Sequence, residues 1–142
     1  MSLKNSYIRY IKYIPSKLEI LDLSDTDIEC IPELPNSLKK IYCNNTYKLY
    51  KILNIPISLK VLDMISSKIL LPQLPEGLLY LRIYSLDMLD NNILPNSIEH
   101  LETKEIYLSI DDSKIYWLCL INLDGFLYFF LKNNNKKYLK YL

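Results

Sequence analysis

The chain is poor in the residues on which catalytic and metal sites depend. Its 142 residues include one histidine, two glycines and three cysteines. The single histidine, His100, leaves no second imidazole to activate a nucleophile, and two isolated glycines cannot build a phosphate-binding loop. The cysteines are odd in number and widely spaced, which favours neither a disulfide framework nor a zinc cluster. We therefore expect a protein that is not an enzyme and that holds no metal or cofactor.

The chain also lacks a charge excess and a long uninterrupted apolar run. Its formal net charge is +1, so no overall field points to nucleic acid. Lys4, Arg9 and Lys12 interrupt any signal-peptide core. The apolar run 115–131 contains polar residues and is short for a membrane span. We expect no nucleic-acid or membrane partner, and a reducing, cytoplasmic location, in a host cell's cytoplasm or in a virion.

What the chain does contain is a hydrophobic pattern with a period near twenty residues. Aliphatic residues recur at intervals of 19 to 21 positions: Leu18, Leu38, Leu59, Leu78, Ile98, Leu118 and Leu139. Three positions after each of them stands another aliphatic residue: Leu21, Ile41, Leu62, Leu81, Leu101, Ile121 and Leu142. A fixed period of this length predicts a solenoid in which each repeat makes one coil.

Within one repeat the pattern predicts a short strand followed by an extended return path. Leu21 and Leu23 alternate with residues of the opposite face, as in a strand with one buried side. Proline lacks an N–H and would break a parallel ladder, so it belongs in the turn before the strand. All seven prolines keep this phase: Pro15, Pro32, Pro35, Pro56, Pro72, Pro75 and Pro95. We expect a parallel sheet on one side and a mostly extended or irregular opposite side with little helix.

The repeats divide residues 1–142 into one domain with three parts. Residues 1–14 form an N-terminal cap, whose apolar spacing fits a helical face or the second half of a repeat equally well. Residues 15–112 hold five repeats. Residues 113–142 hold degenerate C-terminal repeats that cap the stack. An open sheet edge would also allow the chain to associate with itself.

The repeats resemble leucine-rich repeats in their short form of about twenty residues. Residues 34–38 read Leu-Pro-Asn-Ser-Leu, and residues 71–78 read Leu-Pro-Gln-Leu-Pro-Glu-Gly-Leu. This Leu-Pro-x-x-Leu motif is similar to repeats of type III secreted bacterial effectors and to FNIP-type repeats of amoebae and giant viruses. The resemblance spans residues 15–123. It implies a solenoid of the α/β horseshoe class with a concave parallel sheet.

The chain departs from that family at one polar position. The family usually places asparagine there, where it bonds the backbone of neighbouring turns. Here the position is occupied first by hydroxyl residues and then by aliphatic ones: Thr26, Thr46, Ser67, Leu86 and Ile106. A hydroxyl can replace part of that bonding and an aliphatic side chain cannot, so we expect looser or rearranged turns in the last units.

The concave face carries the candidate binding site. Because Leu21 and Leu23 point inward, the residues beside them in each strand are expected to point outward. The positions expected to contact a partner are Tyr42, Val61, Asp63, Ile65, Tyr80, Arg82, Tyr84, His100 and Glu102. A patch rich in tyrosine that includes an arginine has the composition of interaction hot spots. The alternative is that aromatic and β-branched residues simply favour strands, with Asp63 and Arg82 pairing across them.

These features predict a non-enzymatic module that binds a protein or peptide on its concave sheet. Two alternatives stay open. The chain could be a structural or assembly component, for instance of a virus particle, that packs through its sheet edges. It could instead be an adaptor that selects substrates for a ubiquitin ligase supplied by another chain.

Overall fold

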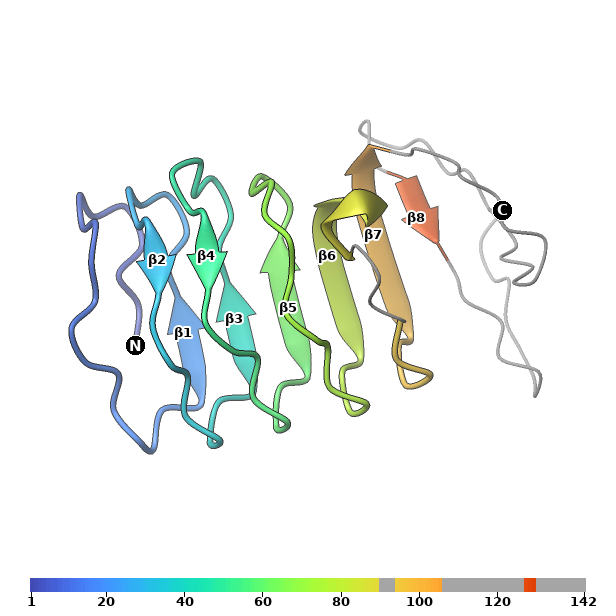
Figure 1. Ribbon diagram of the computed structural model, residues 1–142, viewed down its shortest axis with the longest axis horizontal. Helices are drawn as coiled ribbons and strands as arrows, with labels where there is room; N and C mark the ends of the chain where they lie inside the picture. Colours follow the sequence, from blue (N-terminus) through green and yellow to red (C-terminus); the bar gives the residue numbers. More distant parts are fainter. Residues whose placement is uncertain (90–93, 106–126, 130–142) are drawn as a thin grey trace.

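A computed structural model describes residues 1–89, 94–105 and 127–129 of the chain (Figure 1). Within them the chain winds into a parallel-strand solenoid. Its main sheet has six strands in the order β1-β3-β5-β6-β7-β8. Their bounds are β1 (Ile20–Asp22), β3 (Lys40–Tyr42), β5 (Val61–Met64), β6 (Tyr80–Ser85), β7 (His100–Glu105) and β8 (Leu127–Phe129).

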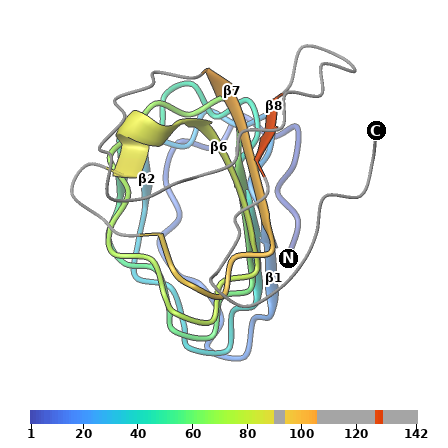
Figure 2. The same ribbon diagram turned by 90° about the vertical axis from the view of Figure 1, so that its right-hand side faces the viewer.

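The opposite wall of the solenoid is mostly extended chain. It holds a two-stranded parallel sheet of β2 (Cys30–Ile31) and β4 (Lys51–Ile52), and one 3-10 helix, η1 (Leu86–Leu89). Figure 2 looks along the stack and shows successive coils with nearly the same outline, the main sheet on one side and β2 on the other. A parallel-sheet solenoid with almost no helix is confirmed.

The hydrophobic columns set the register of the main sheet. Leu21 lies opposite Ile41, and the column continues through Leu62, Leu81 and Leu101. All five side chains are buried in one continuous core. Fully burying a leucine or isoleucine contributes about 1.5–3 kcal/mol, so this column alone is a large stabilising term. The spacing of the aliphatic residues in the sequence is therefore the length of chain that makes one coil of the solenoid.

A proline turn precedes each of the five parallel strands. The carbonyl of the proline accepts a hydrogen bond of 3.0–3.2 Å from the N–H three residues later, at Leu18, Leu38, Leu59, Leu78 and Ile98. In three coils a serine inside this turn ties it to the previous coil. Ser37, Ser58 and Ser97 donate to the carbonyls of Leu18, Leu38 and Leu78 at 2.7, 2.7 and 2.6 Å. The Pro-x-Ser-Leu sequence thus both turns the chain and fixes the spacing of coils.

Hydroxyl side chains, buried at Thr26, Thr46 and Ser67 and partly buried at Ser6, occupy the corresponding turn of the first coils. Ser6, Thr26 and Thr46 each donate to the carbonyl three residues earlier, and the Thr46 and Ser67 hydroxyls lie 2.7 Å apart. At Leu86, where this hydroxyl is lost, the chain forms η1 instead. The rearranged turn expected there is present, and Ile106 lies outside the described residues.

Residues 1–14 form the first coil of the stack. Ser2 and Tyr10 make parallel bridges to Asp22 and Cys30, and the Leu3 N–H donates to the Asp22 carbonyl at 2.8 Å. Of the two expectations for this segment, the repeat pattern is therefore the one observed and the helical face is wrong. The turn after the strand adopts a positive φ in three coils, at Asn5, Asp25 and Asn45 (60°, 59° and 57°). Asparagine and aspartate tolerate this conformation better than other non-glycine residues.

The far edge of the main sheet departs from the expected series. β8 pairs with β7 in the antiparallel sense, with Leu101 opposite Phe129 (Figure 1). The sequence pattern made no prediction for this strand. In the sequence, no proline follows Pro95, whereas a proline turn precedes each of the five parallel strands. The degenerate repeats expected at Leu118–Leu123 and 138–142 lie outside the described residues.

Candidate functional site

The side of the main sheet that faces away from the core is here called the outer face. One residue from each parallel strand lies on it, and these residues are in register: Asp22, Tyr42, Asp63, Arg82 and Glu102. The sheet therefore brings four of the expected partner-binding residues side by side. Val61, Tyr80 and His100 form the neighbouring row, also in register.

Arg82 joins two carboxylates across three strands. Its Nε donates to Glu102 Oε1 at 2.8 Å, and its Nη1 lies 3.5 Å from Asp63 Oδ2. The side chains of Arg82, Asp63 and Glu102 are only 23%, 11% and 8% exposed. The Asp63–Arg82 pair is the one that the alternative interpretation of this patch expected, and Asp63 and Glu102 are buried although both were expected to contact a partner. Their side chains are covered because they share a guanidinium instead of extending into solvent.

The hydrogen-bonding capacity of the buried Asp63 carboxylate is only partly satisfied. Its Oδ1 atom is buried and makes no hydrogen bond, while its other oxygen has only the longer of the two Arg82 contacts. A buried acceptor without a partner costs about 1–3 kcal/mol. Two carboxylates and one guanidinium also leave this cluster with a formal excess of negative charge. The charged groups in the middle of the outer face are therefore not arranged in the way that would give the fold the greatest stability.

Tyr80 adds a fixed hydrogen-bond donor to the same cluster. Its hydroxyl donates to Glu102 Oε2 at 3.3 Å. Burial, and then the charge of Glu102, raise the pKa of Tyr80 to about 12, so the phenol is protonated at neutral pH. For Arg82, burial on its own lowers the pKa, but the charges of Asp63 and Glu102 outweigh it and the net shift is upward. Tyr80 is therefore protonated and Arg82 is charged at neutral pH, so both side chains act as hydrogen-bond donors.

The remaining expected residues are spread around this cluster. The ring of His100, which is exposed, lies 6.0 Å from that of Tyr80. Lys68 and Lys104 place their ammonium groups 4.1 and 5.8 Å from the centre of the Tyr84 ring. Ile65 was expected on the exposed patch, but it is 7% exposed and that expectation is wrong. What partners can reach is therefore mainly Tyr42, Val61, Tyr80, Tyr84 and His100.

A buried thiol lies beneath this surface. Cys43 lies in the core beneath it, and burial raises the pKa of its thiol, with further increases from the charges of Asp22 and Asp63. A thiol in this environment stays protonated and is a poor nucleophile. Within the described ranges no three His, Cys, Asp or Glu residues are grouped as metal ligands would be. In the same part of the chain no helix is long and apolar enough to cross a membrane.

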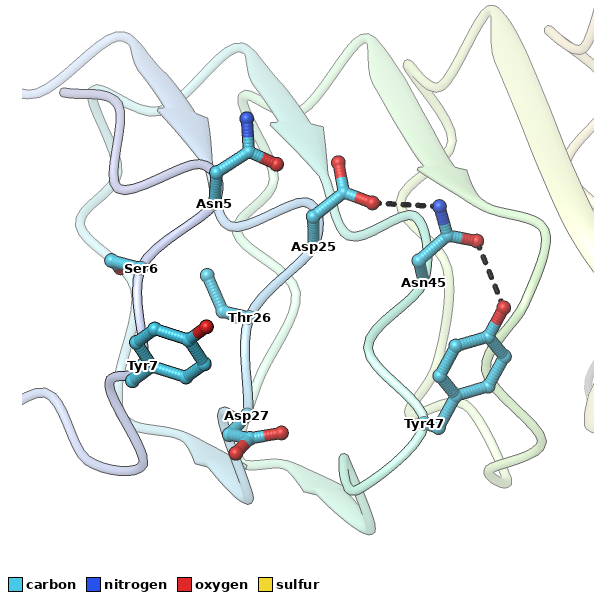
Figure 3. A pocket seen from close by; sticks show the side chains of 8 residues that line it. All are labelled: Asn5, Ser6, Tyr7, Asp25, Thr26, Asp27, Asn45 and Tyr47. Carbon is cyan, nitrogen blue, oxygen red and sulfur yellow. Dashed lines mark hydrogen bonds between the residues drawn. The ribbon is translucent and has the colours of Figure 1, made fainter.

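A second feature lies beside the C-terminal ends of β1 and β3. It is a hollow of about 440 Å³ lined by Asn5, Ser6, Tyr7, Asp25, Thr26, Asp27, Asn45 and Tyr47 (Figure 3). The Asn45 amide donates to Asp25 Oδ1 at 2.7 Å, and the Tyr47 hydroxyl donates to Asn45 Oδ1 at 3.1 Å. The sequence interpretation did not include this hollow. The signal was there, since Tyr7 and Tyr47 stand two repeat periods apart.

Comparisons with protein-family models, with curated proteins and with solved structures gave no match for this chain. A function for it is therefore argued from the geometry of its own residues.

Proposed function

We propose that this chain is a non-enzymatic module of the leucine-rich-repeat type that binds a protein or peptide on the outer face of its main sheet. The observation that carries the proposal is the cluster of Tyr80, Arg82 and Glu102. It holds an arginine and a tyrosine, the residue types that dominate binding hot spots, in fixed positions on a rigid sheet. The cytoplasm, where free thiols persist, is the location that we propose for it.

The dimensions of the face suit a short segment of polypeptide. Parallel strands stack about 4.8 Å apart, so five of them span on the order of 20 Å. Half-buried tyrosines offer large contact areas whose conformational freedom is already restricted, which lowers the entropy cost of binding. Tyr42 comes from β3, and Tyr80 and Tyr84 both come from β6, so a partner lying across the strands would contact all three.

Affinity capture from the cells in which the chain is naturally made would test this function. The baits would be the unmodified chain, the variant Tyr80→Ala/Tyr84→Ala, and the control variant Tyr13→Ala/Tyr50→Ala, whose tyrosines are exposed elsewhere. We expect a bound polypeptide that the control retains and the first variant loses. Circular dichroism would verify that both variants are folded. Equal capture by both variants would contradict binding at the outer face.

Self-association through a sheet edge is the second candidate. β8 covers one edge of the main sheet, and the first coil forms the other. That coil carries Lys4, Arg9 and Lys12, all exposed, and charged side chains of this kind oppose strand addition. Sedimentation of the chain at increasing concentration tests it, and the binding proposal expects a monomer throughout.

A further inference from the structure

The hollow in Figure 3 has a repeated structure that sets it apart from the outer face. Tyr7, Asp27 and Tyr47 each stand one position after the residue whose hydroxyl bonds the turn of their coil. Those hydroxyl residues are Ser6, Thr26 and Thr46. The stacking of coils therefore places the two tyrosines on either side of Asp27, as Figure 3 shows. The two tyrosine side chains are 94% and 75% exposed, so they do not serve the core.

The spacing of the coils leaves room for a flat group between the two rings. Adjacent parallel strands lie about 4.8 Å apart, so Tyr7 and Tyr47, two coils apart, are separated by roughly 10 Å at the backbone. Atoms in contact are about 3.5–4 Å apart, so one layer of ligand between two rings needs roughly 7–8 Å. Small movements of these exposed side chains would close the remaining gap.

The floor of the hollow is anionic and its cations are weakly held. Asp27 pairs with Lys48 at 2.9 Å, and Asp25 lies at 4.0 Å from Lys4, the limit of an ion pair. Both lysine side chains are about half exposed, and pairs of this kind contribute little to stability. Either lysine can therefore give way to a ligand that offers the carboxylates better geometry.

We propose that this hollow binds the guanidinium group of an arginine side chain presented by another polypeptide. A guanidinium is flat, keeps its charge, stacks on aromatic rings and donates two parallel hydrogen bonds to one carboxylate. Tyr7 and Tyr47 supply the rings, and Asp27 between them supplies the carboxylate. The compact, strongly hydrated ammonium of lysine would use the rings and the carboxylate less completely. The site shares no residue with the outer face, so this proposal can be tested independently of the function proposed above.

A titration of the isotope-labelled full chain, followed by amide NMR, tests the proposal. The probe is N-acetyl-arginine amide, and its neutral isostere N-acetyl-citrulline amide is the matched control ligand. We expect the arginine probe alone to shift the amide signals of residues 5–7, 25–27 and 45–47. Tetramethylammonium is the third probe, and we expect it to bind more weakly. No shifts with arginine, equal shifts with citrulline, or tighter binding of tetramethylammonium would each overturn the assignment.

Four variants locate the site. Tyr7→Ala and Tyr47→Ala should each weaken binding of the arginine probe about three- to fivefold, the range for a cation at an exposed aromatic ring. Asp27→Asn should weaken it on the order of tenfold through loss of a charged hydrogen bond. Tyr50→Ala, which removes an exposed tyrosine outside the hollow, should leave it unchanged. Affinity that survives Tyr47→Ala and Asp27→Asn would show that the probe binds elsewhere and would overturn the proposal.

Discussion

Arg82 Nε lies 2.8 Å from Glu102 Oε1, the shorter of the two contacts that this guanidinium makes with carboxylates on the strands beside it. The pairing is asymmetric because Asp63, on the other side, receives only the 3.5 Å contact and keeps one buried oxygen without a partner. The outer face therefore contains a strong hydrogen bond next to an acceptor that is poorly satisfied.

Removing the guanidinium should destabilise the fold. In Arg82→Met the carboxylates of Asp63 and Glu102 remain covered without a cation, and leaving a charged hydrogen-bond partner unsatisfied costs about 2 kcal/mol. Urea unfolding at neutral pH measures the loss. The double variant Arg82→Met/Glu102→Leu should recover part of it, because one of the two buried charges is then gone. An unfolding midpoint that does not move in Arg82→Met would contradict this account.

Leu62 lies at the centre of the buried column, so Leu62→Asp should abolish cooperative unfolding. Its side chain is fully buried between Ile41 and Leu81, and a carboxylate there has no partner. Thermal melts followed by circular dichroism are the measurement. Leu79→Asp, at a position that is partly exposed, is the matched control and should melt nearly as the unmodified chain does. If Leu62→Asp melted in the same way, the register would be wrong.

Stability should fall in alkaline solution because of Tyr80. The pKa of Tyr80 is raised from about 10 to about 12 in the folded chain, so between these values the folded state binds the proton more tightly than the unfolded state. This stabilising contribution is complete below pH 10 and is lost as the pH rises toward 12. Urea midpoints across this range should decline more steeply for the unmodified chain than for Tyr80→Phe. Parallel slopes for the two proteins would show that Tyr80 is not the cause.

Gly77 occupies the position at which the proline turns of the two neighbouring coils have the serines Ser58 and Ser97. We expect Gly77→Ser to stabilise the chain by about 0.5–1 kcal/mol, since a hydroxyl there can donate to the carbonyl of Leu59 and glycine's backbone freedom is removed. A Cβ atom at this position would lie 2.6 Å from Lys60 Nζ, the end of a flexible, exposed side chain that can move.

The comparison for this variant is Gly77→Ala, which has the Cβ without the hydroxyl. Thermal unfolding should rank Gly77→Ser as the more stable of the two. The reverse order would mean that the hydrogen bond from Lys60 Nζ to the Gly77 carbonyl, at 3.0 Å, contributes more to stability than a serine hydrogen bond to the previous coil.

The repeat period predicted the parts of the fold that depend on burial. The columns of Leu21 and Leu18 recur with the coil, so strand positions and register could be read from the sequence. Burial of Asp63 and Glu102 could not be read in this way, because it depends on two side chains folding toward one guanidinium. The antiparallel direction of β8 escaped prediction for a similar reason, since spacing alone does not encode the direction of a strand.

The candidate sites differ in how far the sequence could show them. Alternation along the strands placed Tyr80 and Arg82 on the outer face, but not their shared bonds to Glu102. Tyr7 and Asp27 belong to turns, whose residues have no hydrophobic period, so the only sequence signal for their proximity is the repeat spacing that they share with Tyr47.

The serine bonds between proline turns join points about twenty residues apart in the chain. Three coils are thus tied to their predecessors by the same kind of hydrogen bond, in addition to the backbone pairing of the sheet, and a steady pull on the two ends should release coils one at a time. A fully extended chain spans about 3.4 Å per residue, so each release would lengthen the molecule by roughly 70 Å. Stretching single molecules should therefore show extension in steps of about this length.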